Sequence, residues 1–125
     1  MEYRIAVAST DGKVVNQHFG RAEQFHILSA EGETMDSCFE ESRRTSPVCG
    51  GGDHDPGELK KTAELLADCD YLLVSRIGPG ARQALKERGI EVFELPGLIE
   101  DSLRRLLSYL EVQKLLDGGT GLFGE

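Results

Sequence analysis

The chain has 125 residues, of which 39% are hydrophobic, so it is large enough to form one domain around one core. Its net charge is −8 and its pI is about 4.9, and such an acidic chain repels the phosphates of nucleic acids and anionic membrane surfaces. No apolar run approaches the roughly 20 residues of a bilayer-spanning helix, and residues 1–7 lack the apolar region of a signal peptide, which predicts a cytoplasmic protein.

The N-terminal part of the sequence predicts three consecutive strands. A short apolar run suits a buried strand, and two later segments rich in β-formers are typical of further strands. The turn signals Asp11-Gly12 and Glu31-Gly32 separate them, with a loop over residues 13–22 after the first strand. Strands joined in this way form an antiparallel meander, and the expected strands are residues 3–9, 23–30 and 34–41.

A long loop and the start of a helix are expected next. Residues 42–55 contain arginines, a proline, a cysteine, glycines, aspartates and a histidine, and long loops inside compact domains are more often functional than idle. Asp55 suits the N-cap of the helix, Pro56 its first position and Glu58 its third, which is a capping-box arrangement.

The rest of the chain predicts alternating strands and helices. Residues 70–76 and 90–95 are expected as strands, and the first is apolar enough to be central. Between them, residues 78–80 open a second helix, which stops at Gly89. A third helix is expected over residues 98–116, with an apolar stripe formed by Ile99, Leu103, Leu106, Leu107, Leu110 and Leu115.

This order of elements predicts the fold class and the domain organisation. Three antiparallel strands followed by βαβ units give an α/β domain with a mixed five-stranded sheet flanked by helices. The ribonuclease H-like fold has this order. The domain is expected over residues 1–116, followed by a flexible C-terminal tail over residues 117–125.

The clearest candidate for chemistry is a glycine-rich loop that runs into the first helix. Cys49 and His54 lie five residues apart, and a thiolate and an imidazole are suitable ligands for iron, zinc and iron–sulfur clusters. The glycines between them let a large ligand approach the backbone, and the helix N-terminus favours an anion. Because two ligands do not complete a metal site, a flexible loop with an idle cysteine is the alternative interpretation.

Two further segments could contribute to the same site. His18 lies in the loop after the first strand, where α/β sheets usually place ligands, although a lone histidine is more often exposed or packed. Arg76 ends a strand just before a helix, so it could neutralise an anionic ligand or form a salt bridge at a capping turn. Three widely spaced cysteines do not suggest a disulfide framework, so they are expected to be thiols. Cys38 and Cys69 lie on or beside predicted secondary structure and are expected to be buried or partly buried.

These segments together resemble the dinitrogenase iron–molybdenum cofactor biosynthesis family, which includes NifX, the core domain of NafY and the C-terminal domain of NifB. The resemblance begins at residues 11–25, centred on His18-Phe19-Gly20-Arg21. It continues through residues 49–55, 68–70 and 76–80, which are most similar to the NifB tail, and covers about residues 3–110.

The resemblance implies a carrier that is not an enzyme. Such a carrier binds the iron–molybdenum cofactor or an iron–sulfur precursor cluster between its synthesis and its insertion into apo-dinitrogenase, with cofactor-assembly proteins as further partners. The implied metal ligands are His18, Cys49 and His54. The implied cofactor contacts are His18, Phe19, Gly20, Arg21, Cys49, Gly50, Gly51, His54 and Arg76. The chain has no radical-SAM cysteine motif, so the synthetic step of full NifB is not expected.

Three other functions are alternatives to this one. A ribonuclease H-like nuclease needs carboxylates for two magnesium ions, beginning on the first strand, and residues 3–9 contain no acid. A thiol-dependent hydrolase that uses Cys49 and His54 lacks an orienting partner visible in the sequence. The remaining alternative is a small regulatory or interaction domain that binds zinc or another anionic ligand.

Overall fold

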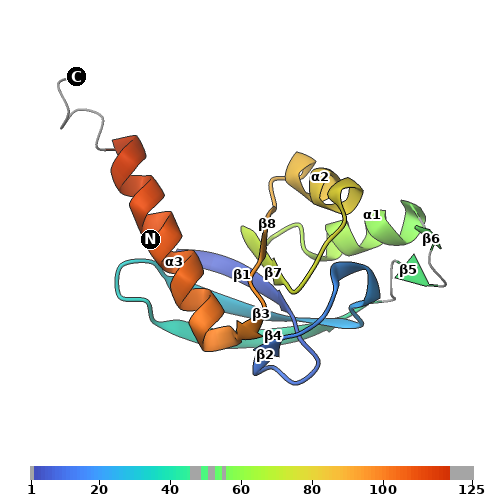
Figure 1. Ribbon diagram of the computed structural model, residues 1–125, viewed down its shortest axis with the longest axis horizontal. Helices are drawn as coiled ribbons and strands as arrows, with labels where there is room; N and C mark the ends of the chain where they lie inside the picture. Colours follow the sequence, from blue (N-terminus) through green and yellow to red (C-terminus); the bar gives the residue numbers. More distant parts are fainter. Residues whose placement is uncertain (1, 46–48, 51–52, 55, 119–125) are drawn as a thin grey trace.

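A five-stranded sheet lies between two layers of helices (Figure 1) in the computed structural model, which describes residues 2–45, 49–50, 53–54 and 56–118. Its strands are β1 (Glu2–Ala8), β3 (Gln24–Glu31), β4 (Ser37–Arg44), β7 (Tyr71–Val74) and β8 (Glu91–Glu94). Their order is β4-β3-β1-β7-β8, in which β1, β3 and β4 pair antiparallel, whereas β1, β7 and β8 pair parallel. The predicted mixed α/β sheet is therefore confirmed.

Three α-helices cover the two faces of this sheet. They are α1 (Pro56–Leu65), α2 (Pro79–Glu87) and α3 (Ile99–Gly118). α1 and α2 pack on one face and α3 packs on the other (Figure 1). Pro56 and Pro79 begin their helices as predicted, because proline fixes φ and lacks the N–H that a first helical residue leaves unpaired. Asp55 and the side chain of Glu58, predicted to cap α1, lie outside the described residues.

Strand β1 supplies both halves of the core. Tyr3, Ile5 and Val7 are buried against α3, whereas Ala6 and Ala8 are buried on the face covered by α1 and α2. Successive side chains of a strand point to opposite faces, so a continuous apolar run can occupy two cores only when both faces are covered. Within the described residues, no helix is long and apolar enough to cross a bilayer.

Helix α3 buries most of its predicted stripe but not all of it. Ile99, Leu103, Leu106, Leu107 and Leu110 are buried as expected. Leu115 is 68% exposed, so the prediction is wrong there, because the last turns of α3 extend past the sheet (Figure 1). The helix includes residues 117 and 118 of the predicted tail, and residues 119–125 lie outside the described part of the chain.

Strand β4 begins and ends later than predicted. The turn before it includes Met35 with φ = +63°, and the strand runs on to Arg44. Arg43 and Arg44 therefore belong to a strand rather than to the loop predicted over residues 42–55. Arg43 donates hydrogen bonds to the Leu65 carbonyl at 2.8 Å and to both carboxylate oxygens of Asp68, so it fastens β4 to the end of α1.

Lowering the pH is expected to remove the stabilisation that the Arg43–Asp68 ion pair provides. The Arg43 guanidinium donates hydrogen bonds that hold the pKa of Asp68 at about 2, below the ordinary value of 3.8. Asp68 therefore binds a proton more readily in the unfolded state than in the folded state. The contribution of the ion pair to the unfolding free energy is complete above about pH 4 and is lost as the pH falls toward 2. Since the Asp68 side chain is 51% exposed, solvent screening limits it to about 1 kcal/mol.

We therefore expect the unfolding free energies of the parent and of Asp68→Asn to differ at about pH 7 and to converge toward about pH 2. Urea unfolding followed by circular dichroism measures this, since the chain has no tryptophan. Glu64→Gln, at an exposed position on α1, is the control and should follow the parent at each pH. A difference between parent and Asp68→Asn that persists undiminished in acid would contradict the assignment.

Candidate functional site

The loop that leaves β1 is shaped by a tight turn. The Asp11 carboxylate accepts hydrogen bonds from the backbone N–H groups of Lys13 (2.9 Å) and Val14 (3.1 Å), and these bonds lower the pKa of Asp11 below its ordinary value. Gly12 has φ = +76°, a backbone conformation that residues other than glycine rarely adopt. The turn therefore has a local cause in the Asp-Gly sequence, and it sends the chain back across the end of the sheet.

A short strand pair then fastens the loop to the rest of the domain. β2 (Val14–Val15) pairs antiparallel with β9 (Gly97–Leu98), next to the start of α3, and the 3-10 helix η1 (Phe19–Arg21) follows. The interpretation of residues 13–22 as a plain loop is therefore wrong in part. Two adjacent β-branched side chains were the local signal for β2, but its partner lies far away in the sequence.

His18 is held beside Arg76 by backbone pairing. The two residues form an isolated parallel β-bridge, and the N–H of Phe19 donates to the Arg76 carbonyl at 2.9 Å. The N–H of Ser75 donates to the Gln17 carbonyl at 3.0 Å. The loop after β1 therefore continues the sheet alongside the segment that follows β7, and two predicted site residues from distant parts of the sequence become neighbours.

A pocket of about 390 Å³ opens beside this bridge. We call it the His18–Arg76 pocket, and its volume lies in the range of about 300–1,000 Å³ that is usual for small-ligand sites. The pocket is lined by His18, Gly20, Arg21, Arg76, Ile77, Gly78 and Pro79. It brings together four of the predicted cofactor contacts, His18, Gly20, Arg21 and Arg76, with the segment at the N-terminus of α2 that follows Arg76.

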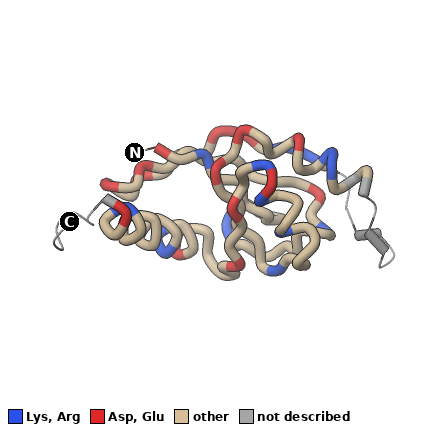
Figure 2. The backbone as a smooth tube through the Cα atoms, turned by 90° about the horizontal axis from the view of Figure 1, so that it is seen from above, with Lys and Arg blue, Asp and Glu red and all other residues tan. Residues whose placement is uncertain are grey.

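The polar side chains of this pocket are positively charged or neutral. Arg21 and Arg76 are exposed, and neither forms an ion pair with a described residue, whereas the guanidinium of Arg43 is held by two carboxylates. His18 is also exposed, and its imidazole has no hydrogen-bond partner in the described part of the chain. Acidic and basic residues are spread along most of the backbone (Figure 2), and the net charge is −8. Two neighbouring arginines without an ion pair to any described residue are therefore a local feature of this pocket.

Phe19 has a different place from the one implied by the sequence. Its side chain is 1% exposed and packs against Phe25, with 6.1 Å between the ring centroids. The ring therefore lies in the core under α1 and α2 and does not line the pocket. Phe19 thus anchors the loop that presents His18. Its ring is buried in the core, and its backbone N–H is bonded to the carbonyl of Arg76.

The glycine-rich segment meets the same end of the domain. β5 (Cys49–Gly50) and β6 (Asp53–His54) form a hairpin in which Cys49 and His54 are opposite each other. The backbone of β5 lies beside η1, within 8 Å between Cα atoms. The side chains of Cys49 and His54, and Gly51 as a whole, lie outside the described part of the chain. Backbone pairing thus puts the two predicted loop ligands next to each other and near the His18 loop.

The other two cysteines differ in exposure. Cys69 is buried, and burial, reinforced by the neighbouring Asp68 carboxylate, raises the pKa of its thiol to about 12, so it stays protonated and unreactive. Cys38 is exposed on the edge strand β4, where a buried or partly buried thiol was predicted. That prediction is wrong because β4 has no neighbouring strand on one side and is exposed along most of its length.

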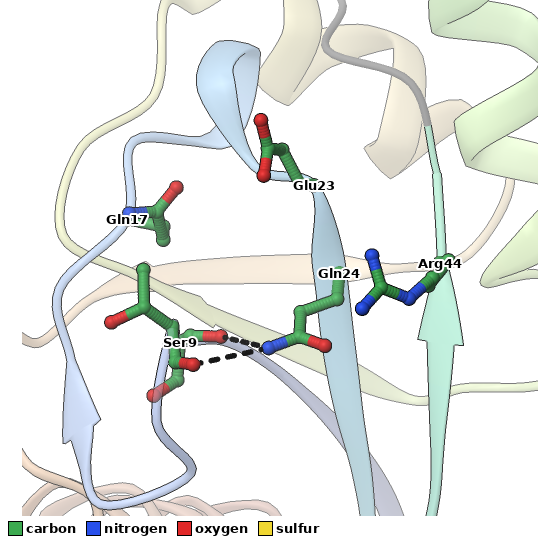
Figure 3. Close-up of a pocket in the computed structure, with 6 residues that line it drawn as sticks. Ser9, Gln17, Glu23, Gln24 and Arg44 are labelled. Atoms are coloured by element: carbon green, nitrogen blue, oxygen red, sulfur yellow. Dashed lines mark hydrogen bonds between the residues drawn. The ribbon is translucent and has the colours of Figure 1, made fainter.

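A second, smaller pocket of about 130 Å³ lies at the end of β1 (Figure 3). The Gln24 side chain donates hydrogen bonds to the carbonyls of Ser9 (3.4 Å) and Thr10 (3.2 Å), and Arg44 is its cross-strand partner on β4. Because Glu23 also lines this pocket, its charges offset one another, and its Gln24 amide is already used within the protein. The larger His18–Arg76 pocket, whose lining contains two arginines and no acidic residue, is therefore the better candidate for an anionic ligand.

Comparison with known proteins agrees with the sequence resemblance. The family model "Dinitrogenase iron-molybdenum cofactor" matches residues 1–109. The chain is 39% identical over 105 residues to the FeMo cofactor biosynthesis protein NifB of Frankia alni and 35% identical over 99 residues to that of Chlorobaculum tepidum, and these matches cover 82% and 79% of this chain. They cover only 20% and 22% of those two proteins, so the chain spans about a fifth of the length of these curated relatives.

A solved structure with related sequence is also similar. The apo form of the orange protein from Desulfovibrio gigas matches with a TM-score of 0.51 and 30% identity, and the match covers 93% of this chain and 88% of that protein. The family model alone spans most of the chain, including both sides of the His18–Arg76 pocket. This chain belongs to the dinitrogenase iron–molybdenum cofactor family.

Proposed function

We propose that this domain binds a preformed anionic metal cluster, either the iron–molybdenum cofactor or an iron–sulfur precursor, and carries it without acting as an enzyme. The observation that supports this most is the His18–Arg76 pocket, where an imidazole lies with two guanidinium groups, none of which has a hydrogen-bond or ion-pair partner among the described side chains. An imidazole nitrogen can bind a metal of the cluster, and the guanidiniums compensate the cluster's negative charge. The curated relatives are FeMo cofactor biosynthesis proteins, which gives the cluster its expected identity.

The charge of the pocket favours a cluster over a bare metal ion. Arg21 and Arg76 repel a free divalent cation, whereas the same groups attract an assembly whose sulfides make it an anion. The N-terminus of α2 adds partial positive charge at Gly78 and Pro79. The alternative function, a regulatory or interaction domain that binds zinc, requires His18, Cys49 and His54 to hold a cation against this charge.

A carrier needs moderate affinity and reversible release. His18 is exposed on an open surface, so a cluster bound there can be passed on without unfolding the domain. We propose Cys49 and His54 as supplementary ligands, because the backbone of β5 lies beside η1. Gly20, Gly50 and Gly51 would leave room for a bulky cluster near the backbone.

The partners and the location of the carrier follow from this cargo. Apo-dinitrogenase or cofactor-assembly proteins are the proposed recipients, and the cytoplasm is the proposed location. We also infer that the fold belongs to the ribonuclease H-like group, which the three antiparallel strands followed by βαβ units support.

Anaerobic loading tests this proposal. The purified protein is incubated with isolated iron–molybdenum cofactor, with a synthetic thiolate-ligated [4Fe–4S] cluster, or with Zn²⁺ alone, and metals are measured after gel filtration. We expect iron to co-elute in stoichiometric amount with the cluster probes, and molybdenum with the cofactor. Retention of zinc in tetrahedral geometry together with no retained iron would overturn the carrier proposal in favour of the regulatory alternative.

Filling the pocket is expected to weaken binding without harming the fold. Gly78 lines the pocket with φ = −77°, which alanine accepts, and an added Cβ would meet no protein atom within 4 Å. Gly78→Ala should therefore leave the domain folded while it lowers cofactor affinity severalfold, with a loss of unfolding free energy of no more than about 1 kcal/mol because alanine is a poorer N-cap than glycine. Gly80→Ala is the matched control, since its Cβ also enters open space but not the pocket lining. Equal affinity in both variants would place the cluster away from Gly78.

A further inference from the structure

We propose that Glu94 of β8 is a positioning residue that fixes the Arg76–Ile77 peptide and thereby sets Arg76 beside His18. Glu94 does not line the His18–Arg76 pocket, so it acts through the backbone that does. This inference rests on the function proposed for the pocket and adds a residue that nothing in the local sequence indicates.

One peptide unit at the rim of the pocket is held from both sides. The carbonyl of Arg76 accepts a hydrogen bond from the N–H of Phe19 at 2.9 Å. The N–H of Ile77 donates to Oε2 of Glu94 at 3.0 Å. These two groups belong to the same planar trans peptide, in which the C=O and the N–H point in opposite directions. The plane of this peptide is therefore fixed by η1 on one side and by the end of β8 on the other.

The Glu94 side chain acts where the regular strand pairing ends. The last backbone hydrogen bond between β7 and β8 runs from the N–H of Leu95 to the carbonyl of Val74 at 3.1 Å. The next residue is Pro96, which has no N–H to continue the ladder. The carboxylate of Glu94 reaches beyond that point and supplies an acceptor for Ile77.

The carboxylate is itself held in place by α2. Arg82 lies with Nη2 3.4 Å from Oε1 of Glu94, and its Nη1 donates to the Val92 carbonyl at 2.7 Å. One carboxylate oxygen thus faces Arg82 while the other accepts from Ile77. Such a doubly held carboxylate orients the peptide better than a freely rotating side chain would.

Without Glu94, the Arg76–Ile77 peptide would keep one hydrogen bond to the described residues, the bond from Phe19. The peptide could then rotate about that bond, and rotation would move the Arg76 side chain relative to His18. The segment that follows would still be held, because Ile77 packs against the core and the Gly78 carbonyl accepts a hydrogen bond from the N–H of Arg82 at 3.0 Å. The expected effect of losing Glu94 is therefore a weaker pocket in a folded domain.

A double-mutant cycle tests this role with isolated iron–molybdenum cofactor as the probe. Anaerobic titrations compare the parent with Glu94→Ala, Glu94→Gln, Arg76→Ala and the Glu94→Ala/Arg76→Ala pair. We expect Glu94→Ala to weaken binding about tenfold, and Glu94→Gln to restore it to within about threefold, because an amide oxygen still accepts from Ile77. We expect Glu94→Ala to add no further loss once Arg76 is alanine, because it acts through that residue. Additive losses would overturn the proposal.

Hydrogen exchange of the Ile77 amide gives a second measurement that needs no ligand. We expect the exchange rate to rise in Glu94→Ala and to return toward the parent's rate in Glu94→Gln. Glu91→Ala, at an exposed position on the same strand, is the control and should leave both affinity and exchange unchanged. An unchanged Ile77 rate in Glu94→Ala overturns the positioning role, whereas a parent protein that fails to bind the cofactor overturns the proposed function and leaves the exchange result to decide on Glu94.

Discussion

Replacing His18 by alanine is expected to lower the affinity for the iron–molybdenum cofactor by at least about tenfold. Mutation of a residue that only hydrogen-bonds to a metal ligand typically lowers metal affinity about 10–100-fold. Removal of the ligand itself should lower the affinity at least as much. The same change should alter the unfolding free energy by no more than about 0.5 kcal/mol, because the imidazole is exposed and forms no hydrogen bond with a described side chain. Anaerobic absorbance titration and urea unfolding measure the two effects.

A second histidine serves as the control for this experiment. His26 lies on β3, and its Nδ1 is 3.1 Å from the Ser42 hydroxyl, so His26→Gln can keep a polar contact there. His26 is not part of the pocket, and we expect this variant to bind the cofactor as the parent does. If His18→Ala bound the cofactor as tightly as the parent, His18 would not be the cluster ligand.

Replacing Phe19 by alanine is expected to destabilise the whole domain. The side chain is 1% exposed in the core, and truncation of a buried phenylalanine typically costs about 3–5 kcal/mol because a cavity remains. That is a large part of the roughly 5–15 kcal/mol that keeps a domain folded. Urea unfolding should show a much lower midpoint, and cofactor binding should fall with it, because Phe19 anchors the loop that presents His18.

Phe39 provides a matched control of the same residue type. It is 55% exposed on β4, so Phe39→Ala should change the unfolding free energy by less than about 1 kcal/mol. Phe19→Leu should recover much of the stability, since it restores apolar volume in the core. Similar unfolding midpoints for Phe19→Ala and Phe39→Ala would show that Phe19 does not anchor the loop.

Most of the fold could be predicted from the sequence because its signals are local. The apolar run of β1, the Asp11-Gly12 turn and the proline starts of α1 and α2 each act within a few residues. The ends of β4 were placed wrongly, because its exposed residues have no apolar pattern to mark them and Arg43 is fixed by Asp68, a residue of a later segment.

The placement of His18 beside Arg76 in the candidate site was predictable, because both residues follow the ends of strands. His18 and Arg76 follow strands that lie next to each other in the sheet, so their neighbourhood follows from the topology. The inward orientation of Phe19 could not be predicted from its place beside His18, because the direction of its ring depends on the core beneath η1. The contact between Glu94 and Ile77 depends on where β8 ends, and no local pattern indicates it.

The parallel bridge between His18 and Arg76 also determines when the site can exist. The two walls of the pocket come from opposite halves of the chain and meet only through sheet pairing. A nascent chain on the ribosome therefore cannot present this pocket until β7 and the start of α2 have been synthesised and have paired with β1. A short synthetic peptide around His18 would lack the wall formed by Arg76, so the proposed binding of a cluster would require a chain in which these two segments have already paired.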